Sequence, residues 1–143
     1  MEAHQLFLNL STRNAGEAMD RSEFKCLRKK LDKTQKQMAH LLGVSLKAVH
    51  SYEQGWRVVP SAVERQLFFL VSRLNSGSGR KACWEERNCS PERQSECPAC
   101  EFNSGDLCWF VNGSICHGQV QNSWEDKMKL CRSCEVFISQ TSV

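Results

Sequence analysis

The sequence predicts two small domains: an all-α domain of five helices, followed by a small cysteine-rich domain with little regular structure. Three observations lead to this division. Apolar residues recur at helical spacing from about residue 21 to residue 74. A stretch of asparagine, serine and glycine at 75–79 then interrupts the pattern. Eight of the nine cysteines lie beyond it, between Cys83 and Cys134.

The 143-residue chain has a net charge of +3, and that charge is unevenly distributed. Residues 21–75 hold 11 Lys and Arg against 4 Asp and Glu, whereas residues 80–143 hold 7 against 9. A basic block beside a mildly acidic one is typical of a nucleic-acid-binding domain joined to another kind of domain. No apolar run is long enough to span a membrane, and no signal-peptide pattern is present. We therefore expect a cytoplasmic protein without a membrane partner.

The N-terminal part begins with a weakly patterned segment. We expect residues 1–20 to be a flexible extension, with Met19 as an alternative start of the chain. Phe24, Leu27 and Leu31 then repeat at helical spacing among basic residues, which predicts an amphipathic helix.

The stretch TQKQMAHLLGVSLKAVHSYEQGWRVVP, residues 34–60, predicts two short helices joined by a tight turn. Thr34 and Gln37 form the capping-box pattern that begins a helix. Gly43 stands where that helix should end, because glycine readily adopts the left-handed conformation. Ser45 then caps a second helix. Helix, glycine turn and helix are the skeleton of a helix-turn-helix DNA reader.

The same stretch resembles the Cro/phage-repressor (Xre-type) helix-turn-helix family, over about residues 24–74. The matching features are the leading LR, the TQ that opens the first motif helix, MA and LLGVS across the turn, and a closing G-x-R-x-x-P. The family more often has one residue fewer before that proline. The resemblance implies a λ-repressor-like domain at residues 21–75 that binds double-stranded DNA as a homodimer.

Eight residues are candidates for DNA contact. Gln35, in the first turn of its helix, is placed to hold a phosphate with its side chain and the helix N-terminus. In similar proteins, the positions of Leu46, Lys47 and Ser51 reach base edges in the major groove, where lysine donates to guanine. We expect His50 nearer the phosphate backbone. The full set is Thr34, Gln35, Ser45, Leu46, Lys47, His50, Ser51 and Arg57.

The remaining positions of these helices have expected structural roles. Glu53 is expected to pair with Arg57 and hold the following loop. The predicted core residues are Ala39, Leu42, Val44, Val49 and Tyr52. Residues 61–74 predict one further helix, with Ser61 as its N-cap. Its apolar surface either closes the core or forms a dimer or docking face.

Residues 83–137 contain an internal repeat. Each unit begins Cys-Trp, carries a lone cysteine within nine residues, and ends Cys-x-x-Cys-Glu before a Phe. Four thiolates can close a tetrahedral shell around zinc or hold an iron–sulfur cluster. In a reducing cytoplasm, clustered cysteines more often bind metal than form disulfides. The candidate ligands are Cys83, Cys89, Cys97, Cys100, Cys108, Cys116, Cys131 and Cys134.

The division of these ligands is open. They can separate by repeat, with Cys83, Cys89, Cys97 and Cys100 in one site and the others in a second. Alternatively, the two Cys-x-x-Cys turns share one site and the lone cysteines are disulfides, a second site or free thiols. His117 can replace one thiolate.

The motifs CWE, CPA, GDLCW, GSICHG and CRSCEVF resemble the two-CW domain, a cysteine-rich module of bacterial chemotaxis and other signalling proteins. Many relatives have an aromatic residue where Cys100 stands. This difference favours one four-cysteine site plus other thiols.

The sequence thus predicts a bacterial, sequence-specific transcriptional regulator. A linker at 76–82 joins its DNA-binding domain to a metal-binding domain at 83–137, with a tail at 138–143. The metal, zinc before an iron–sulfur cluster, is expected to be structural or to sense metal or redox state. The alternative is a signalling adaptor whose cysteine-rich domain docks on a partner protein. An enzyme is not expected, because no Ser/His/Asp set, HExxH motif or thioredoxin-type βαβ pattern appears.

Overall fold

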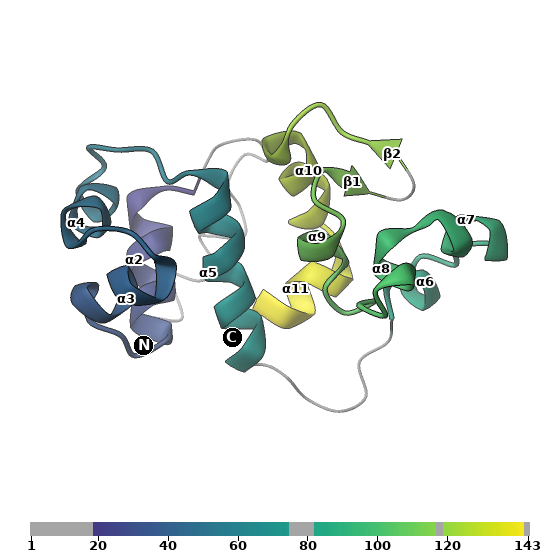
Figure 1. Ribbon diagram of the computed structural model, residues 1–143, viewed down its shortest axis with the longest axis horizontal. Helices are drawn as coiled ribbons and strands as arrows, with labels where there is room; N and C mark the ends of the chain where they lie inside the picture. Colours follow the sequence, from purple (N-terminus) through teal and green to yellow (C-terminus); the bar gives the residue numbers. More distant parts are fainter. Residues whose placement is uncertain (1–18, 75–81, 117–118, 142–143) are drawn as a thin grey trace. The chain divides into compact units, whose positions relative to one another are not determined.

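The computed structural model describes residues 19–74, 82–116 and 119–141 (Figure 1). The chain divides into two compact units, residues 1–74 and 75–143. The described residues are predominantly helical, with ten helices and one two-stranded sheet. None of these helices is both long enough and apolar enough to cross a bilayer. The expected extension up to residue 18, nearly all of the expected linker, and His117 lie outside the described residues.

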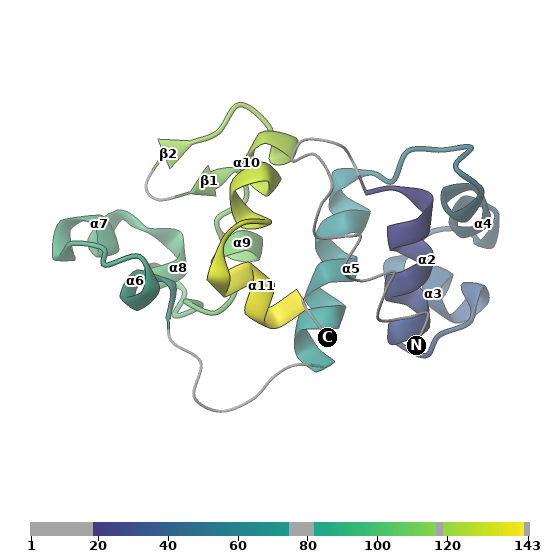
Figure 2. The same ribbon diagram turned by 180° about the vertical axis from the view of Figure 1, so that it is seen from behind.

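The first unit has four described helices, and the fifth helix of the expected fold is not among them. The four are α2 (Arg21–Lys30), α3 (Gln35–Leu42), α4 (Leu46–Gln54) and α5 (Ser61–Leu74). Helix α4 packs against α2 and α3, and α5 packs against the same two helices. Figure 2 shows this group from behind, with α2 between α4 and α5.

The predicted helix boundaries around the turn are confirmed. Thr34 Oγ1 accepts from the Gln37 N–H at 3.1 Å, and the Gln37 side chain accepts from the Thr34 N–H at 2.9 Å. Gly43 closes α3 in the left-handed conformation, with φ of 67°. Ser45 Oγ then accepts from the Ala48 N–H at 3.0 Å and caps α4. These local hydrogen bonds satisfy backbone groups that a helix end would otherwise leave unpaired.

Two boundary predictions at the ends of this unit are wrong. Met19 and Asp20 belong to the folded unit rather than to a flexible extension. Met19 is buried, and Asp20 caps α2 by accepting from the Glu23 N–H at 2.8 Å. Ser61 lies inside α5 as its first residue rather than before it as a cap.

The core of the first unit lies where the helices meet. Of the five predicted core residues, Ala39, Leu42, Val49 and Tyr52 are buried and Val44 is half-buried. Helix α2 adds Phe24, whose ring centroid lies 5.5 Å from that of Tyr52. Burial of these apolar side chains is the main force that holds the short helices together.

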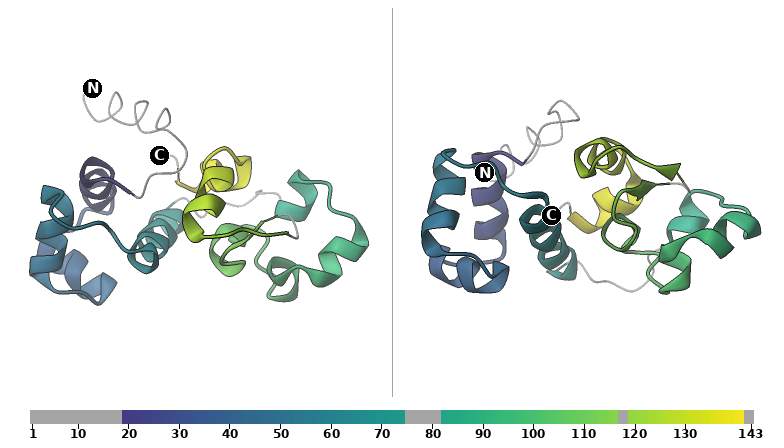
Figure 3. Two further views of the ribbon diagram at one scale, coloured as in Figure 1. Left: turned by 90° about the horizontal axis from the view of Figure 1, so that it is seen from above. Right: turned by 45° about the horizontal axis from the view of Figure 1, so that its top comes forward.

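The second unit is also largely helical, which corrects the expectation of little regular structure (Figure 3). Two antiparallel strands of two residues each pair Ile115 with Val120. Start signals explain the short helices: Ser90 and Ser123 accept capping hydrogen bonds, and Pro91 and Pro98 occupy first helical positions. The elements are α6 (Cys83–Glu86), α7 (Pro91–Glu96), α8 (Pro98–Glu101), α9 (Cys108–Val111), β1 (Ile115–Cys116), β2 (Gln119–Val120), α10 (Trp124–Cys131) and α11 (Glu135–Thr141).

Trp109 is the centre of the core in this unit. Its ring packs edge-on against Phe137, with centroids 5.4 Å apart, and its Nε1–H donates to Gln140 Oε1 at 3.2 Å. Gln140 and Thr141 are buried. The expected tail therefore forms the C-terminal part of α11 as far as Thr141, and it packs against the core.

Gly105 holds the first repeat against the loop before α9. Its carbonyl accepts from the Cys83 N–H at 2.8 Å. A Cβ at this position would lie 2.7 Å from the Cβ of Ala82 and 2.7 Å from the Trp84 ring. Only glycine fits this close approach without a shift of the neighbouring chain.

We therefore expect Gly105→Ala to destabilise the second unit by about 1–3 kcal/mol, as overpacking of a tight contact does. The measurement is thermal unfolding of the full chain. Asp106→Ala is the matched control, because Asp106 is exposed and its replacement should change stability by less than about 0.5 kcal/mol. Equal midpoints for the two variants would contradict the packing argument.

Candidate nucleic-acid interface and cysteine cavity

Helix α4 presents an exposed face that carries three of the predicted DNA contacts. Leu46 is 49% exposed, and Lys47 and His50 are exposed as well. The opposite face is buried through Ala48, Val49 and Tyr52. The helix therefore exposes a mixed apolar and basic face to solvent, while its opposite face packs against α2 and α3.

Ser51 was expected on this exposed face, and that prediction is wrong. Its side chain is buried, and its Oγ donates to the Lys47 carbonyl at 2.8 Å. In helical angle Ser51 lies between exposed Lys47 and buried Ala48, at the edge of the exposed face, and it is 6% exposed. The hydroxyl is used within the helix and is not presented to a base edge.

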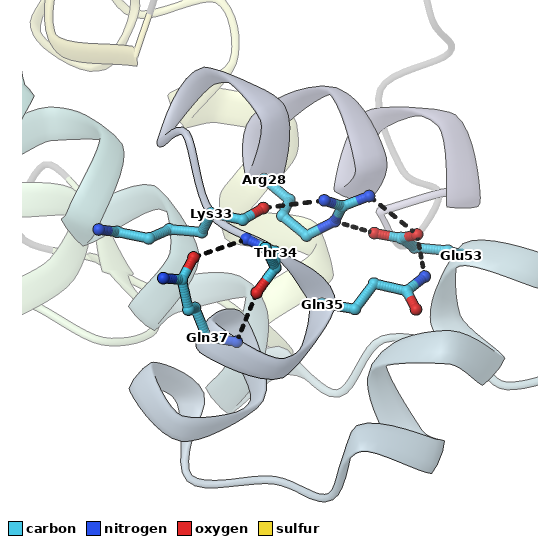
Figure 4. A network of polar contacts seen from close by, with 6 residues as sticks. All are labelled: Arg28, Lys33, Thr34, Gln35, Gln37 and Glu53. Atoms are coloured by element: carbon cyan, nitrogen blue, oxygen red, sulfur yellow. Dashed lines mark hydrogen bonds and ion pairs between the residues drawn. The ribbon is translucent and has the colours of Figure 1, made fainter.

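Glu53 does not pair with Arg57 as expected, but with Arg28 of α2 and Gln35 of α3 (Figure 4). Arg28 Nε and Nη2 donate to its two carboxylate oxygens, and Gln35 Nε2 donates to Oε2 at 2.6 Å. Arg28 Nη1 also donates to the Lys33 carbonyl at 2.8 Å. Arg57 lies instead over the ring of Tyr52, 5.7 Å from its centroid. The network ties α2, α3 and α4 together at one end of α3.

This network also adds a structural role to the one expected of Gln35. Its Nε2 donates to Glu53, which gives the side chain a structural role beside the phosphate contact expected of it. The predicted sites Thr34 and Ser45 likewise use their hydroxyls as acceptors in helix caps. Both hydroxyls therefore have a structural role beside the DNA contacts expected of them.

The loop after α4 adds side chains to its exposed face. The rings of His50 and Trp56 meet edge-on with centroids 5.5 Å apart, and Trp56 is 71% exposed. Gln54, four residues after His50, is exposed on the same helix. Gln54 is therefore a further candidate contact that was not predicted, although its helical spacing from His50 was the available signal.

In the second unit, one cavity of about 50 Å³ gathers most of the predicted metal ligands. Cys100 is the one predicted ligand that does not line it. All nine cysteines of the chain are described and are free thiols. The lining cysteines come from both repeats and are Cys83, Cys89, Cys97, Cys108, Cys116, Cys131 and Cys134.

The first cysteines of the two repeats are hydrogen-bonded partners. The Cys108 thiol donates to Cys83, which lowers the pKa of Cys83 and raises the pKa of Cys108. Burial raises the pKa of Cys131 to about 12 and also raises that of Cys116. Most of these thiols therefore stay protonated at neutral pH unless an ion displaces their protons.

The charged residues that line the cavity are all basic. They are Arg87, Arg93 and Lys127, and no carboxylate is among the described lining residues. The hydrogen bond to Cys134 raises the pKa of Arg87. Lys127 is 1% exposed, and its Nζ donates to the Trp109 carbonyl at 2.9 Å. Three cations beside seven thiols suit a cavity whose sulfurs become thiolates.

The donor set fits a thiophilic metal, although the described side chains do not yet converge on a point. Among residues 19–74, 82–116 and 119–141, no three His, Cys, Asp or Glu side chains form a group that could hold an ion. Soft thiolate donors select zinc, copper(I) or iron–sulfur clusters. A bound metal would have to draw the sulfurs inward from the walls of the cavity.

Comparison with known proteins finds no matching family model, no matching curated protein and no matching solved structure.

Proposed function

We propose that this protein is a sequence-specific DNA-binding transcriptional regulator whose cysteine-rich unit binds a metal. The exposed face of α4 is the main support for the proposal. It combines Leu46, Lys47 and His50 on a helix whose opposite face is buried. The major groove of B-DNA admits one α-helix, and side chains of these kinds contact base edges or phosphates there.

The surroundings of α4 support this role. Residues 21–75 carry a charge of +7, which favours association with a phosphate backbone. The buried network around Glu53 holds the start of α3 against α4 and α2. If α3 rests on the DNA backbone, the network therefore fixes the angle at which α4 enters the groove. Such a pre-organised pair binds without a further ordering cost.

We propose that the protein binds DNA as a homodimer on two half-sites about 34–36 Å apart. Helix α5 offers the apolar surface for this contact, since Leu74 is 57% exposed and Phe69 and Leu70 are half-buried.

The test is selection of duplexes from a random pool by the full chain, followed by affinity measurements over a range of salt. We expect the selected sequence to be palindromic, because a two-fold symmetric dimer binds two half-sites. Affinity should fall steeply with salt, because each neutralised phosphate releases a counterion. Binding without sequence preference and with a weak salt dependence would favour the signalling adaptor instead.

Lys47→Ala is expected to weaken binding to the selected duplex by about 1–3 kcal/mol and to relax selection at one base pair. The lysine is exposed on α4, so its removal should leave the fold intact. Lys129→Ala is the control, since it removes an equal charge from an exposed position in the other unit. An equal loss of affinity for both variants would contradict base readout by Lys47.

For the second unit we propose metal binding through the cavity thiols, with zinc or iron as the metal. Thiolate-bound zinc contributes directly to folding, and an iron–sulfur cluster adds redox sensitivity. Either metal would give the regulator a domain whose stability depends on metal supply or on oxidation.

A further inference from the structure

Within the cysteine cavity, five thiols form an inner group. The Cys108 thiol donates to Cys83, and the neighbouring Cys131 and Cys134 add to the rise of the pKa of Cys108. Cys116 interacts with Cys83 and Cys134, and also with Cys131. Four members belong to the second repeat, whereas Cys83 belongs to the first.

The other cysteines of the first repeat lie outside this group. Cys89 and Cys97 line the cavity and interact with each other, and Cys89 also interacts with Cys83. Cys97 Sγ accepts a hydrogen bond from Asn112 Nδ2 at 3.5 Å. Cys100 does not line the cavity. The first repeat therefore does not gather its own four thiols around one point.

The basic residues of the cavity accompany the inner group. Arg87 hydrogen-bonds with Cys134, and its charge also acts on Cys108 and Cys116. Lys127 acts on Cys116 and Cys131. Four thiolates around Zn²⁺ leave a net charge of about −2, and clusters held by four thiolates are also anionic. Two adjacent cations offset that charge in a buried site.

Asn112 gives a second indication that the cavity takes a bound group. It lines the cavity and is 8% exposed, and its Oδ1 has no hydrogen-bond partner among the described residues. An unpaired buried carbonyl costs free energy, and its presence at a cavity wall is typical of a site completed by a ligand or water.

We propose that the cavity holds one thiophilic metal centre per chain, with Cys83, Cys108 and two of Cys116, Cys131 and Cys134 as its ligands. This inference rests on the metal-binding half of the proposed function and adds the number of centres and their place. One shared centre joins the two repeats, whereas Cys89, Cys97 and Cys100 are dispensable for binding. Zinc and an iron–sulfur cluster share this thiolate chemistry.

The experiment measures zinc, iron and acid-labile sulfide in the full chain, produced without air and with either zinc or iron supplied. One zinc or one cluster per chain is expected. A variant with Cys89→Ser, Cys97→Ser and Cys100→Ser together should keep the full content, and is the matched control. Cys83→Ser and Cys108→Ser, each alone, should lower bound metal at least about tenfold, because ligand loss exceeds the effect of losing a group that supports a ligand.

Three outcomes would overturn the inference in different ways. Full metal content in Cys83→Ser would place the centre in the second repeat alone, and would leave metal binding itself in force. Two centres in the wild type and one in the triple variant would place one centre in each repeat, and would leave metal binding itself in force. No metal in either preparation would overturn both the inference and the proposed metal binding. The triple variant decides between one centre and two even if Cys108→Ser disturbs folding, because serine at the outer positions leaves every inner ligand in place.

Discussion

Replacing Glu53 with alanine is expected to destabilise the first unit by about 3–5 kcal/mol, because it leaves the Arg28 guanidinium partly buried without its carboxylate. The side chain of Glu53 is 3% exposed and that of Arg28 is 13% exposed. Gln35 loses the same acceptor. Removal of one partner from a buried pair is costly, even where the intact pair adds little net stability.

Hydrogen exchange on the full chain is the measurement for Glu53→Ala, because it reports on the two units separately. Amides of α2, α3 and α4 should lose protection, while those of the second unit should not change. Gln54→Ala is the control, since Gln54 is the exposed neighbour of Glu53 on the same helix. If Glu53→Ala exchanges like Gln54→Ala, the network does not hold the three helices together.

Replacing Trp109 with alanine is expected to destabilise the second unit by about 3–5 kcal/mol, as large-to-small changes at aromatic core positions do. Trp109 is 1% exposed, and it contacts the rings of Phe110 and Phe137. In a unit with so few aliphatic residues, neighbouring side chains cannot easily fill the space that it leaves.

Urea unfolding followed by circular dichroism tests this prediction, with Phe102→Ala as the control. Phe102 is 64% exposed, so its removal should have little effect on the free energy of unfolding. The assignment of Trp109 as the centre of the core would be wrong if the two substitutions shifted the unfolding midpoint by similar amounts.

The helices of the first unit could be predicted because their start and end signals are local. The capping box at Thr34 and the left-handed Gly43 depend on residues no more than five positions apart. The partner of Glu53 could not be predicted in this way. Arg28 lies 25 positions earlier, and only the packing of α2 against α4 brings the two together.

The candidate sites show the same limit. Helical spacing predicted the exposure of Leu46 and Lys47, but it did not reveal that Ser51 turns inward to bond with a backbone carbonyl. In the second unit, the repeat predicted which cysteines are available. It could not predict that Cys83 and Cys108 meet, because the two residues lie in different repeats and only the folding of the whole unit brings them together.

The most direct test of DNA reading by α4 is the affinity of the full chain for its selected duplex, compared at one salt concentration with a shuffled duplex of the same composition. We predict at least about a thousandfold preference for the selected sequence, the lower end for specific DNA-binding proteins. Equal affinity for the two duplexes, with the first unit folded, would contradict the proposal that this protein reads DNA sequence.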